Sequence, residues 1–151
     1  MILVLNGPNL NLLGIRETEI YGTTTLEDLA AQCEVWGKDI GLEVTSRQSN
    51  FEGQLIDWLH RAESDGFDGI ALNAGGLTHT SVSLRDAIAG VSIPVVEVHL
   101  SNVHARDAFR HHSLITGVCL GSIIGFGPTS YRAALLCLGA HLSFATAAGN
   151  G

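Results

Sequence analysis

"ILVL" (residues 2–5) runs directly into "NGPN" (residues 6–9), and this junction decides how the chain folds. Four consecutive apolar residues that stop at a cluster of Gly, Pro and Asn are typical of a buried β-strand ending in a loop. Comparable stretches recur along the chain, and we expect further strands at 43–48, 69–74, 93–100 and within 117–127.

Segments with helical spacing of apolar residues separate these strands. After residue 23, Leu26 and Leu29 begin a pattern that fits one face of a helix, and Thr24 with Glu27 predicts a capping box at its start. Further helices are expected at 52–64, at 80–90 with Thr80 or Ser81 as the cap, and at 130–142, with a short helix or turn at 108–112.

Strands that alternate with helices predict βαβ units and a parallel sheet with helices on both faces. Five strands in 151 residues suit a flavodoxin-like, doubly wound α/β domain with strand order 2-1-3-4-5. We therefore expect one domain over residues 1–142. The small, polar residues 143–151 are expected to form a flexible tail.

The composition excludes several classes of protein. Hydrophobic residues make up 46% of the chain and charged residues 15%, which is enough apolar material for a core and unlike a disordered chain. No apolar run reaches the roughly 18 residues of a membrane helix, and the start has no basic segment typical of a secretory leader. The net charge of −7 argues against nucleic acid as a partner.

The cysteines and the lysine narrow the chemistry further. Cys33, Cys119 and Cys137 are odd in number and far apart, which fits buried, reduced thiols in a cytoplasm better than a disulfide framework or a zinc site. Lys38 is the only lysine, and it falls on the polar side of its predicted helix. Chemistry through a Schiff-base lysine is therefore not expected.

Polar residues collect after the strands at 2–5, 69–74 and 93–100. In a doubly wound sheet, ligands bind beyond the carboxyl ends of the strands, where the strand order reverses. The candidates there are Asn6, Asn9, Asn11, Arg16 and Tyr21 after the first strand, Asn73, His79, Arg85 and Asp86 after the third, and His99, Ser101, Asn102, His104, Arg106 and Arg110 after the fourth. One such residue alone would be an ordinary loop residue, but three converging loops that carry them indicate a site.

Several kinds of site do not fit these residues. Asn6 and Asn73 stand where a phosphoacceptor domain would carry acids, and neither GxGxxG nor GxxxxGK[ST] follows the first strand. A zinc site from His99, His104, His111 and His112 matches no metal-binding spacing. What remains is Arg for an anion, His for proton transfer and Asn for hydroxyls, without a cofactor. A binding module for a nucleotide or anion, without catalysis, is the alternative.

Four long segments resemble the type II 3-dehydroquinate dehydratases, and the resemblance runs from Ile2 to about Leu138. The segments are "LNGPNLNLLGIRETEIYG" (5–22), "SNFEGQLIDWLH" (49–60), "NAGGLTHTSVSLRDA" (73–87) and "EVHLSNVHARDAFRHHS" (97–113). The resemblance implies a flavodoxin-like fold, a dodecamer built as a tetramer of trimers, and conversion of 3-dehydroquinate to 3-dehydroshikimate and water in the shikimate pathway. It also implies that neither a metal nor a Schiff base takes part.

The same resemblance implies a role for each site residue. Tyr21 would remove the C2 proton, Arg16 would hold Tyr21 as phenolate, His99 would protonate the departing C1 hydroxyl, and Asn9 would hold a water near the enolate oxygen. Asn73, Leu100 and Ser101 would bind the carboxylate of the substrate, and His79 and Arg110 would bind its hydroxyls. Asp86 would reach the substrate from a neighbouring subunit. Glu97 and Arg106 would orient other groups.

A phenolate suits this reaction because the C2 proton is only weakly acidic. A free phenol has a pKa of about 10, and a nearby guanidinium favours the charged form. Tyr21 and Arg16 both lie on the polar stretch 16–22, which we expect to be a loop that admits substrate and then closes over it.

Overall fold

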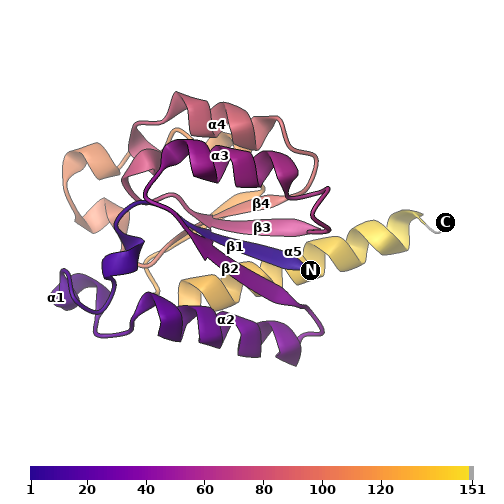
Figure 1. Ribbon diagram of the computed structural model, residues 1–151, viewed down its shortest axis with the longest axis horizontal. Coiled ribbons are helices and arrows are strands. Elements are labelled where there is room, and N and C mark those ends of the chain that lie inside the picture. Colours follow the sequence, from indigo (N-terminus) through magenta and orange to yellow (C-terminus); the bar gives the residue numbers. More distant parts are fainter. Residues whose placement is uncertain (150–151) are drawn as a thin grey trace.

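The computed structural model describes residues 1–149, except for the side chain of Tyr21. Its centre is one parallel sheet of five strands in the order β2-β1-β3-β4-β5 (Figure 1). The strands are β1 Ile2–Asn6, β2 Val44–Gln48, β3 Gly69–Asn73, β4 Val95–His99 and β5 Gly121–Ile124. The predicted doubly wound fold and its strand order are confirmed.

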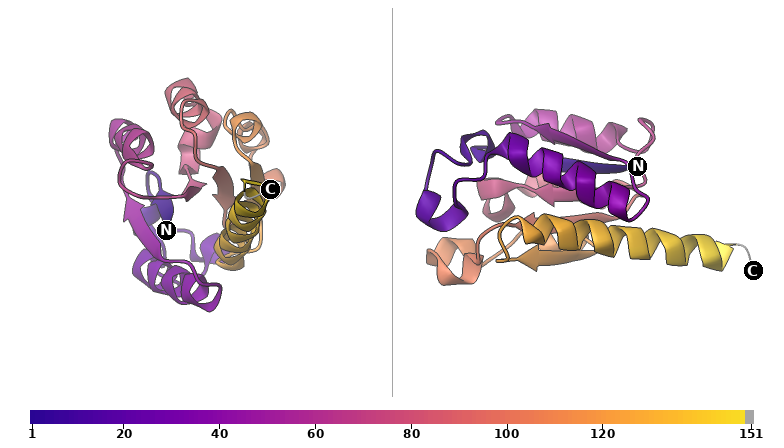
Figure 2. Two further views of the ribbon diagram at one scale, coloured as in Figure 1. Left: turned by 90° about the vertical axis from the view of Figure 1, so that its right-hand side faces the viewer. Right: turned by 90° about the horizontal axis from the view of Figure 1, so that it is seen from below.

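Helices cover both faces of the sheet. They are α1 Thr18–Tyr21, α2 Leu26–Asp39, α3 Glu52–Arg61, α4 Val82–Ala89 and α5 Thr129–Gly149. Helices α3 and α4 lie on one face, while α2 and α5 lie on the other (Figures 1 and 2). Along β1, Ile2 and Val4 pack into the core on the α2–α5 side, whereas Leu3 and Leu5 pack into the core on the α3–α4 side. Burial on both faces explains why β1 is apolar at consecutive positions.

Short 3-10 helices occupy the connections: η1 Leu10–Leu12, η2 Gly75–His79, η3 Val103–Ala105, η4 Ala108–Arg110 and η5 Thr116–Val118. The predicted short helix or turn at 108–112 corresponds to η4, and the predicted strand region 117–127 divides into the end of η5 and β5. The connections that follow β1, β3 and β4 lie at the same end of the molecule as α1. The C-terminal end of α5 points the opposite way (Figures 1 and 2).

Helices α3 and α4 are slightly shorter than predicted, and the start of α2 and the end of α5 differ from prediction in their contacts and length. Thr25, not Thr24, caps α2: its hydroxyl accepts a hydrogen bond from the backbone N–H of Asp28, whose carboxylate accepts one from the backbone N–H of Thr25. Helix α5 continues past residue 142 to Gly149, so residues 143–149 of the expected tail are helical. Residues 150 and 151 of that tail lie outside the described residues. At α4 the cap is Ser81, one of the two predicted candidates.

The remaining sequence expectations concern single side chains. Lys38 is exposed near the end of α2, as predicted. All three cysteines are free thiols, but only Cys33 is buried as expected: Cys119 is half-buried, and Cys137 is exposed on α5, so the prediction of burial is wrong there. Within residues 1–149, no helix has both the length and the apolar character that crossing a membrane requires.

Candidate active site

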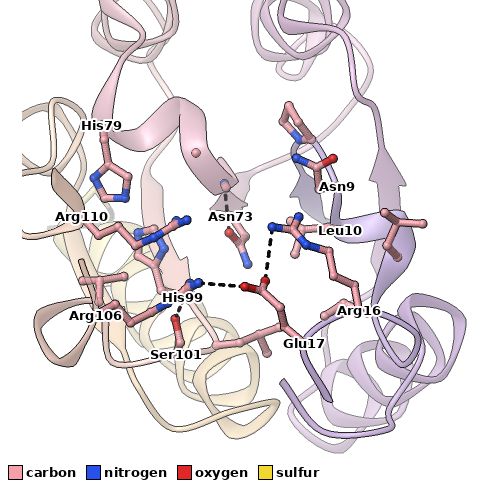
Figure 3. Close-up of a pocket in the computed structure, with 17 residues that line it drawn as sticks. Asn9, Leu10, Arg16, Glu17, Asn73, His79, His99, Ser101, Arg106 and Arg110 are labelled. Carbon is pink, nitrogen blue, oxygen red and sulfur yellow. Dashed lines mark hydrogen bonds and ion pairs between the residues drawn. The ribbon is translucent and has the colours of Figure 1, made fainter. Parts of the chain in front are cut away.

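A pocket opens beyond the carboxyl ends of β1, β3 and β4, next to the point where the strand order reverses (Figure 3). Its cavity volume is about 120 Å³. The structure brings together in its wall most of the residues predicted from sequence, namely Asn9, Arg16, Asn73, His79, His99, Leu100, Ser101, Arg106 and Arg110. Connections that are far apart in sequence therefore meet where the topology predicts a site.

His99 and Glu97 form a hydrogen-bonded pair at this pocket. His99 is the last residue of β4, and residues two apart on a strand project from the same face, so Glu97 lies beside it. The Nε2 atom of His99 is 2.7 Å from Oε1 of Glu97. An ionised carboxylate can only accept, so Nε2 donates this bond, and Nδ1 is the ring nitrogen left for a ligand.

Glu97 is fully buried and held by two further hydrogen bonds. The hydroxyl of Ser113 donates to Oε1 over 3.0 Å, and the hydroxyl of Thr116 donates to Oε2. Burial raises the pKa of Glu97, but the hydrogen bonds from His99, Thr116 and Ser113 outweigh it, so the pKa lies below its ordinary value of 4.5. A negative charge therefore lies against His99 at neutral pH.

The His79 ring is fixed in one orientation. Its Nδ1 lies 2.8 Å from the carbonyl oxygen of His112 and must donate to it, because a carbonyl only accepts. Burial lowers the pKa of His79, the bond to His112 offsets part of this, and the positive charges of His99 and Arg110 lower it further, to below 6.5. At pH 7 the ring is therefore neutral, and Nε2 can accept a hydrogen bond from a hydroxyl.

The pocket wall contains three arginines that were predicted from the sequence, Arg16, Arg106 and Arg110. It also contains one acid, Glu17, that was not predicted. Glu17 lies between two of the arginines: its Oε2 is 3.3 Å from Nη2 of Arg16, and its Oε1 is 3.5 Å from Nη2 of Arg106 (Figure 3). Arg110 holds its guanidinium over the ring of Phe109 at 4.8 Å from the centroid. Only its position beside Arg16 could have singled out Glu17 in the sequence. An arginine-rich wall of this kind suits an anionic ligand.

The loop after β1 has a restricted backbone. Asn9 and Glu17 both have positive φ, at 70° and 48°, a conformation that non-glycine residues rarely adopt and that often occurs at functional sites. Gly14 has φ of 83°, and a Cβ there would come within 2.9 Å of the Thr23 carbonyl oxygen. The stretch predicted as a loop contains helix α1, and the backbone of Tyr21 belongs to it. The side chain of Tyr21 lies outside the described residues, so its role stays a prediction.

Other predicted residues lie outside the pocket wall. Asp86 is exposed on α4, and its Oδ1 lies 2.8 Å from Nη1 of Arg85. The histidines weighed as zinc ligands form no such set. Within the described part of the chain, no three His, Cys, Asp or Glu residues are grouped to hold a metal.

The rest of the wall is mostly apolar or glycine, and sequence reasoning did not single it out. It consists of Pro8, Leu10, Leu12, Leu13, Gly75, Gly76 and Val103. Apolar loop residues carry no signal that separates a pocket wall from ordinary packing, so only the folded chain could identify them.

The chain is similar to known proteins over most of its length. A family model described as "Dehydroquinase class II" matches residues 1–139. The 3-dehydroquinate dehydratase of Thermus thermophilus is 58% identical over 138 residues, covering 91% of this chain and 93% of the relative. That of Deinococcus radiodurans is 58% identical over 135 residues, covering 89% and 94%. The crystal structure of the type II dehydroquinase from Butyrivibrio crossotus has a TM-score of 0.89 and 48% identity, over 91% of this chain and 95% of that one.

Proposed function

Because the chain belongs to the class II dehydroquinase family, we propose that its pocket binds 3-dehydroquinate and that the protein is a 3-dehydroquinate dehydratase, a hydro-lyase of the shikimate pathway. In the first step of the reaction, a base removes a proton from C2. In the second step, the C1 hydroxyl takes up a proton from an acid and leaves as water. An enolate forms between the two steps and collapses to the enone 3-dehydroshikimate. The buried His99–Glu97 pair facing a wall with three arginines is the observation that carries this proposal.

We assign the acid step to His99. Glu97 accepts the hydrogen of Nε2, so a protonated His99 can deliver the hydrogen on Nδ1 to the departing hydroxyl. The carboxylate of Glu97 attracts the imidazolium form and fixes the orientation of the ring. The ring that donates the proton is thereby oriented before the substrate binds.

The base is assigned to Tyr21 through the family resemblance. Its backbone lies in α1, on the connection that also carries Arg16. A guanidinium near the phenol would favour the phenolate and so supply a strong base near neutral pH. Asn9, also in the pocket wall, would hold a water near the enolate oxygen.

The remaining wall residues bind the substrate in this proposal. Asn73 and the Leu100–Ser101 segment receive the carboxylate, and Arg110 binds a ring hydroxyl. The neutral His79 can accept a hydrogen bond from another hydroxyl through Nε2. Arg106 orients Ser101, since its Nη1 lies 3.5 Å from the Ser101 hydroxyl.

We also propose that the chain works as a cytoplasmic homododecamer, a tetramer of trimers. In that assembly Asp86 of one subunit would reach the substrate of its neighbour, which suits its exposed position on α4. No redox cofactor is needed, because the elimination breaks one C–H and one C–O bond to release water with no net change in oxidation state.

A turnover assay tests the proposal directly. The enone product absorbs in the ultraviolet, so the purified protein should generate absorbance from 3-dehydroquinate, whereas a nucleotide- or anion-binding module would generate none. Tyr21→Phe keeps the ring and removes the oxygen, so this variant should lose nearly all turnover. It should also stop exchanging deuterium at C2. Exchange at the wild-type rate would exclude Tyr21 as the base.

A further inference from the structure

Tyr131 is the second tyrosine of the chain, and the proposed reaction gives it no part. It lies in the first turn of α5 and is fully buried. Its hydroxyl is nevertheless placed among polar groups: it donates to Oδ1 of Asn6 over 2.7 Å and accepts from Nδ2 of Asn73 over 2.9 Å. A hydroxyl buried in an apolar core is costly unless it is satisfied in this way.

The two partners are the last residues of the central strands. Asn6 ends β1 and Asn73 ends β3, and the two are directly paired in the sheet. Alternation along each strand turns both side chains toward the face that α5 covers. Tyr131 therefore ties α5 to the strand ends at which the pocket opens.

The contacts of Asn73 determine which way its amide faces. Its Oδ1 accepts a hydrogen bond from the backbone N–H of Gly75 over 3.1 Å, while Nδ2 donates to Tyr131. An amide nitrogen carries two hydrogens, and Tyr131 accepts only one. Because Asn73 also lines the pocket, the second N–H is the group that a bound anion can reach (Figure 3).

We propose that Tyr131 is a positioning residue of the active site: its hydroxyl holds the Asn73 amide so that an N–H, and not the carbonyl oxygen, meets the carboxylate of the substrate. This inference rests on the proposed function. A reversed amide would present an acceptor to an anion and repel it. Burial raises the pKa of Tyr131 well above that of a free phenol, so the hydroxyl keeps its hydrogen and its bond to Asn6 throughout the working pH range.

A purely structural Tyr131 would affect stability alone, and kinetics separate the two roles. Tyr131→Phe keeps the packed ring and removes the hydroxyl. We expect KM for 3-dehydroquinate to rise about tenfold, the factor that corresponds to losing about 1.4 kcal/mol of binding, with a smaller change in kcat. In an Asn73→Ala background, adding Tyr131→Phe should leave KM unchanged, because the group that Tyr131 positions is already absent.

Ser130→Ala is the matched control. Ser130 is also fully buried at the start of α5, and its hydroxyl accepts a hydrogen bond from the backbone N–H of Phe126, away from Asn73. Both variants should unfold at lower temperature than the wild type, but only Tyr131→Phe should raise KM. An equal KM in the two variants, or a rise that persists without the Asn73 amide, would overturn the inference.

Two further outcomes are also informative. If Tyr131→Phe does not fold, Asn6→Ala takes its place in the same cycle, since it removes the acceptor that directs the Tyr131 hydroxyl. A KM that rises only when Asn73 is present supports the inference, and an unchanged KM overturns it. If the wild-type protein itself does not turn over 3-dehydroquinate, the proposed function fails first and this inference falls with it.

Discussion

At the scale of single residues, Glu97 and His99 show how two residues two positions apart on a strand can form a hydrogen-bonded pair of an acid and a histidine. The first residue is an acid with no exposed surface, the second is a histidine that faces a pocket, and the sheet places both on the same side. His99 was singled out in the sequence by its place at the end of a predicted strand, and Glu97 through the resemblance alone. Their direct contact, and the hydroxyls of Ser113 and Thr116 that complete it, depend on segments that meet only in the folded chain.

Glu97→Gln tests this pair, because it keeps the shape of the side chain and removes the charge. We expect kcat to fall by about tenfold or more, since a hydrogen bond to a charged group contributes about 1.5 kcal/mol or more. Thr116→Val is the control: it removes one hydrogen bond to the same carboxylate and keeps the charge, so its kcat should fall less than that of Glu97→Gln.

The same substitution should change how stability depends on acidity. Folding lowers the pKa of Glu97 below its ordinary value of 4.5, so the unfolded chain binds this proton more readily than the folded one. The stability that Glu97 contributes is therefore present above pH 4.5 and is lost as pH falls through the lower folded value. Chemical unfolding at several acidic pH values should show a steeper loss for the wild type than for Glu97→Gln. Equal slopes would contradict this account.

At the scale of elements, the order and type of the main helices and strands could be predicted because their apolar periods are strong. Boundaries were harder to predict. Thr24 and Thr25 are each followed three residues later by an acid, so sequence alone offers two capping boxes, and only the backbone of the folded chain selects Thr25. The segment that forms helix α1 was expected to be a loop, because its four residues, Thr18–Tyr21, are too few to show the helical spacing of apolar side chains.

The two threonines give a direct test at this scale. Thr25→Ala removes the hydroxyl that caps α2 and should lower the free energy of unfolding by about 1 kcal/mol. Thr24→Ala should change it by a few tenths at most, as is usual for a substitution away from such contacts. Thermal unfolding of the two variants side by side checks this. If Thr24→Ala were the more damaging change, the assigned start of α2 would be wrong.

At the scale of the whole molecule, the position of Asp86 links the proposed binding of substrate to the assembly of several chains. It is exposed on α4 and does not line the pocket of its own chain, so its proposed role requires a second subunit. Light scattering of the purified protein should give a mass of roughly twelve chains if it assembles as proposed. A fully active monomer would contradict both the assembly and the role of Asp86.

Asp86→Ala should leave that mass unchanged and raise KM about tenfold, because a hydrogen bond to a charged group contributes about 1.5 kcal/mol or more. Asp57→Ala is the control, since Asp57 is an exposed acid on α3, the helix beside α4, and also lies outside the pocket wall. Equal KM values for the two variants would show that Asp86 does not contact the substrate.

The three thiols differ in exposure, so a thiol-reactive reagent should modify one of them selectively in the native protein. Burial raises the pKa of Cys33 and of Cys119 to about 12, so neither forms much thiolate near neutral pH, whereas Cys137 is exposed on α5. A maleimide dye should therefore attach to Cys137 first, and mass spectrometry should find one label per chain before unfolding and three after it. Labelling of Cys33 in the native protein would contradict this. Because Cys137 lies outside the pocket wall, a dye there would give each chain a fluorescent tag, with which exchange of subunits between the proposed assemblies could be followed while the enzyme works.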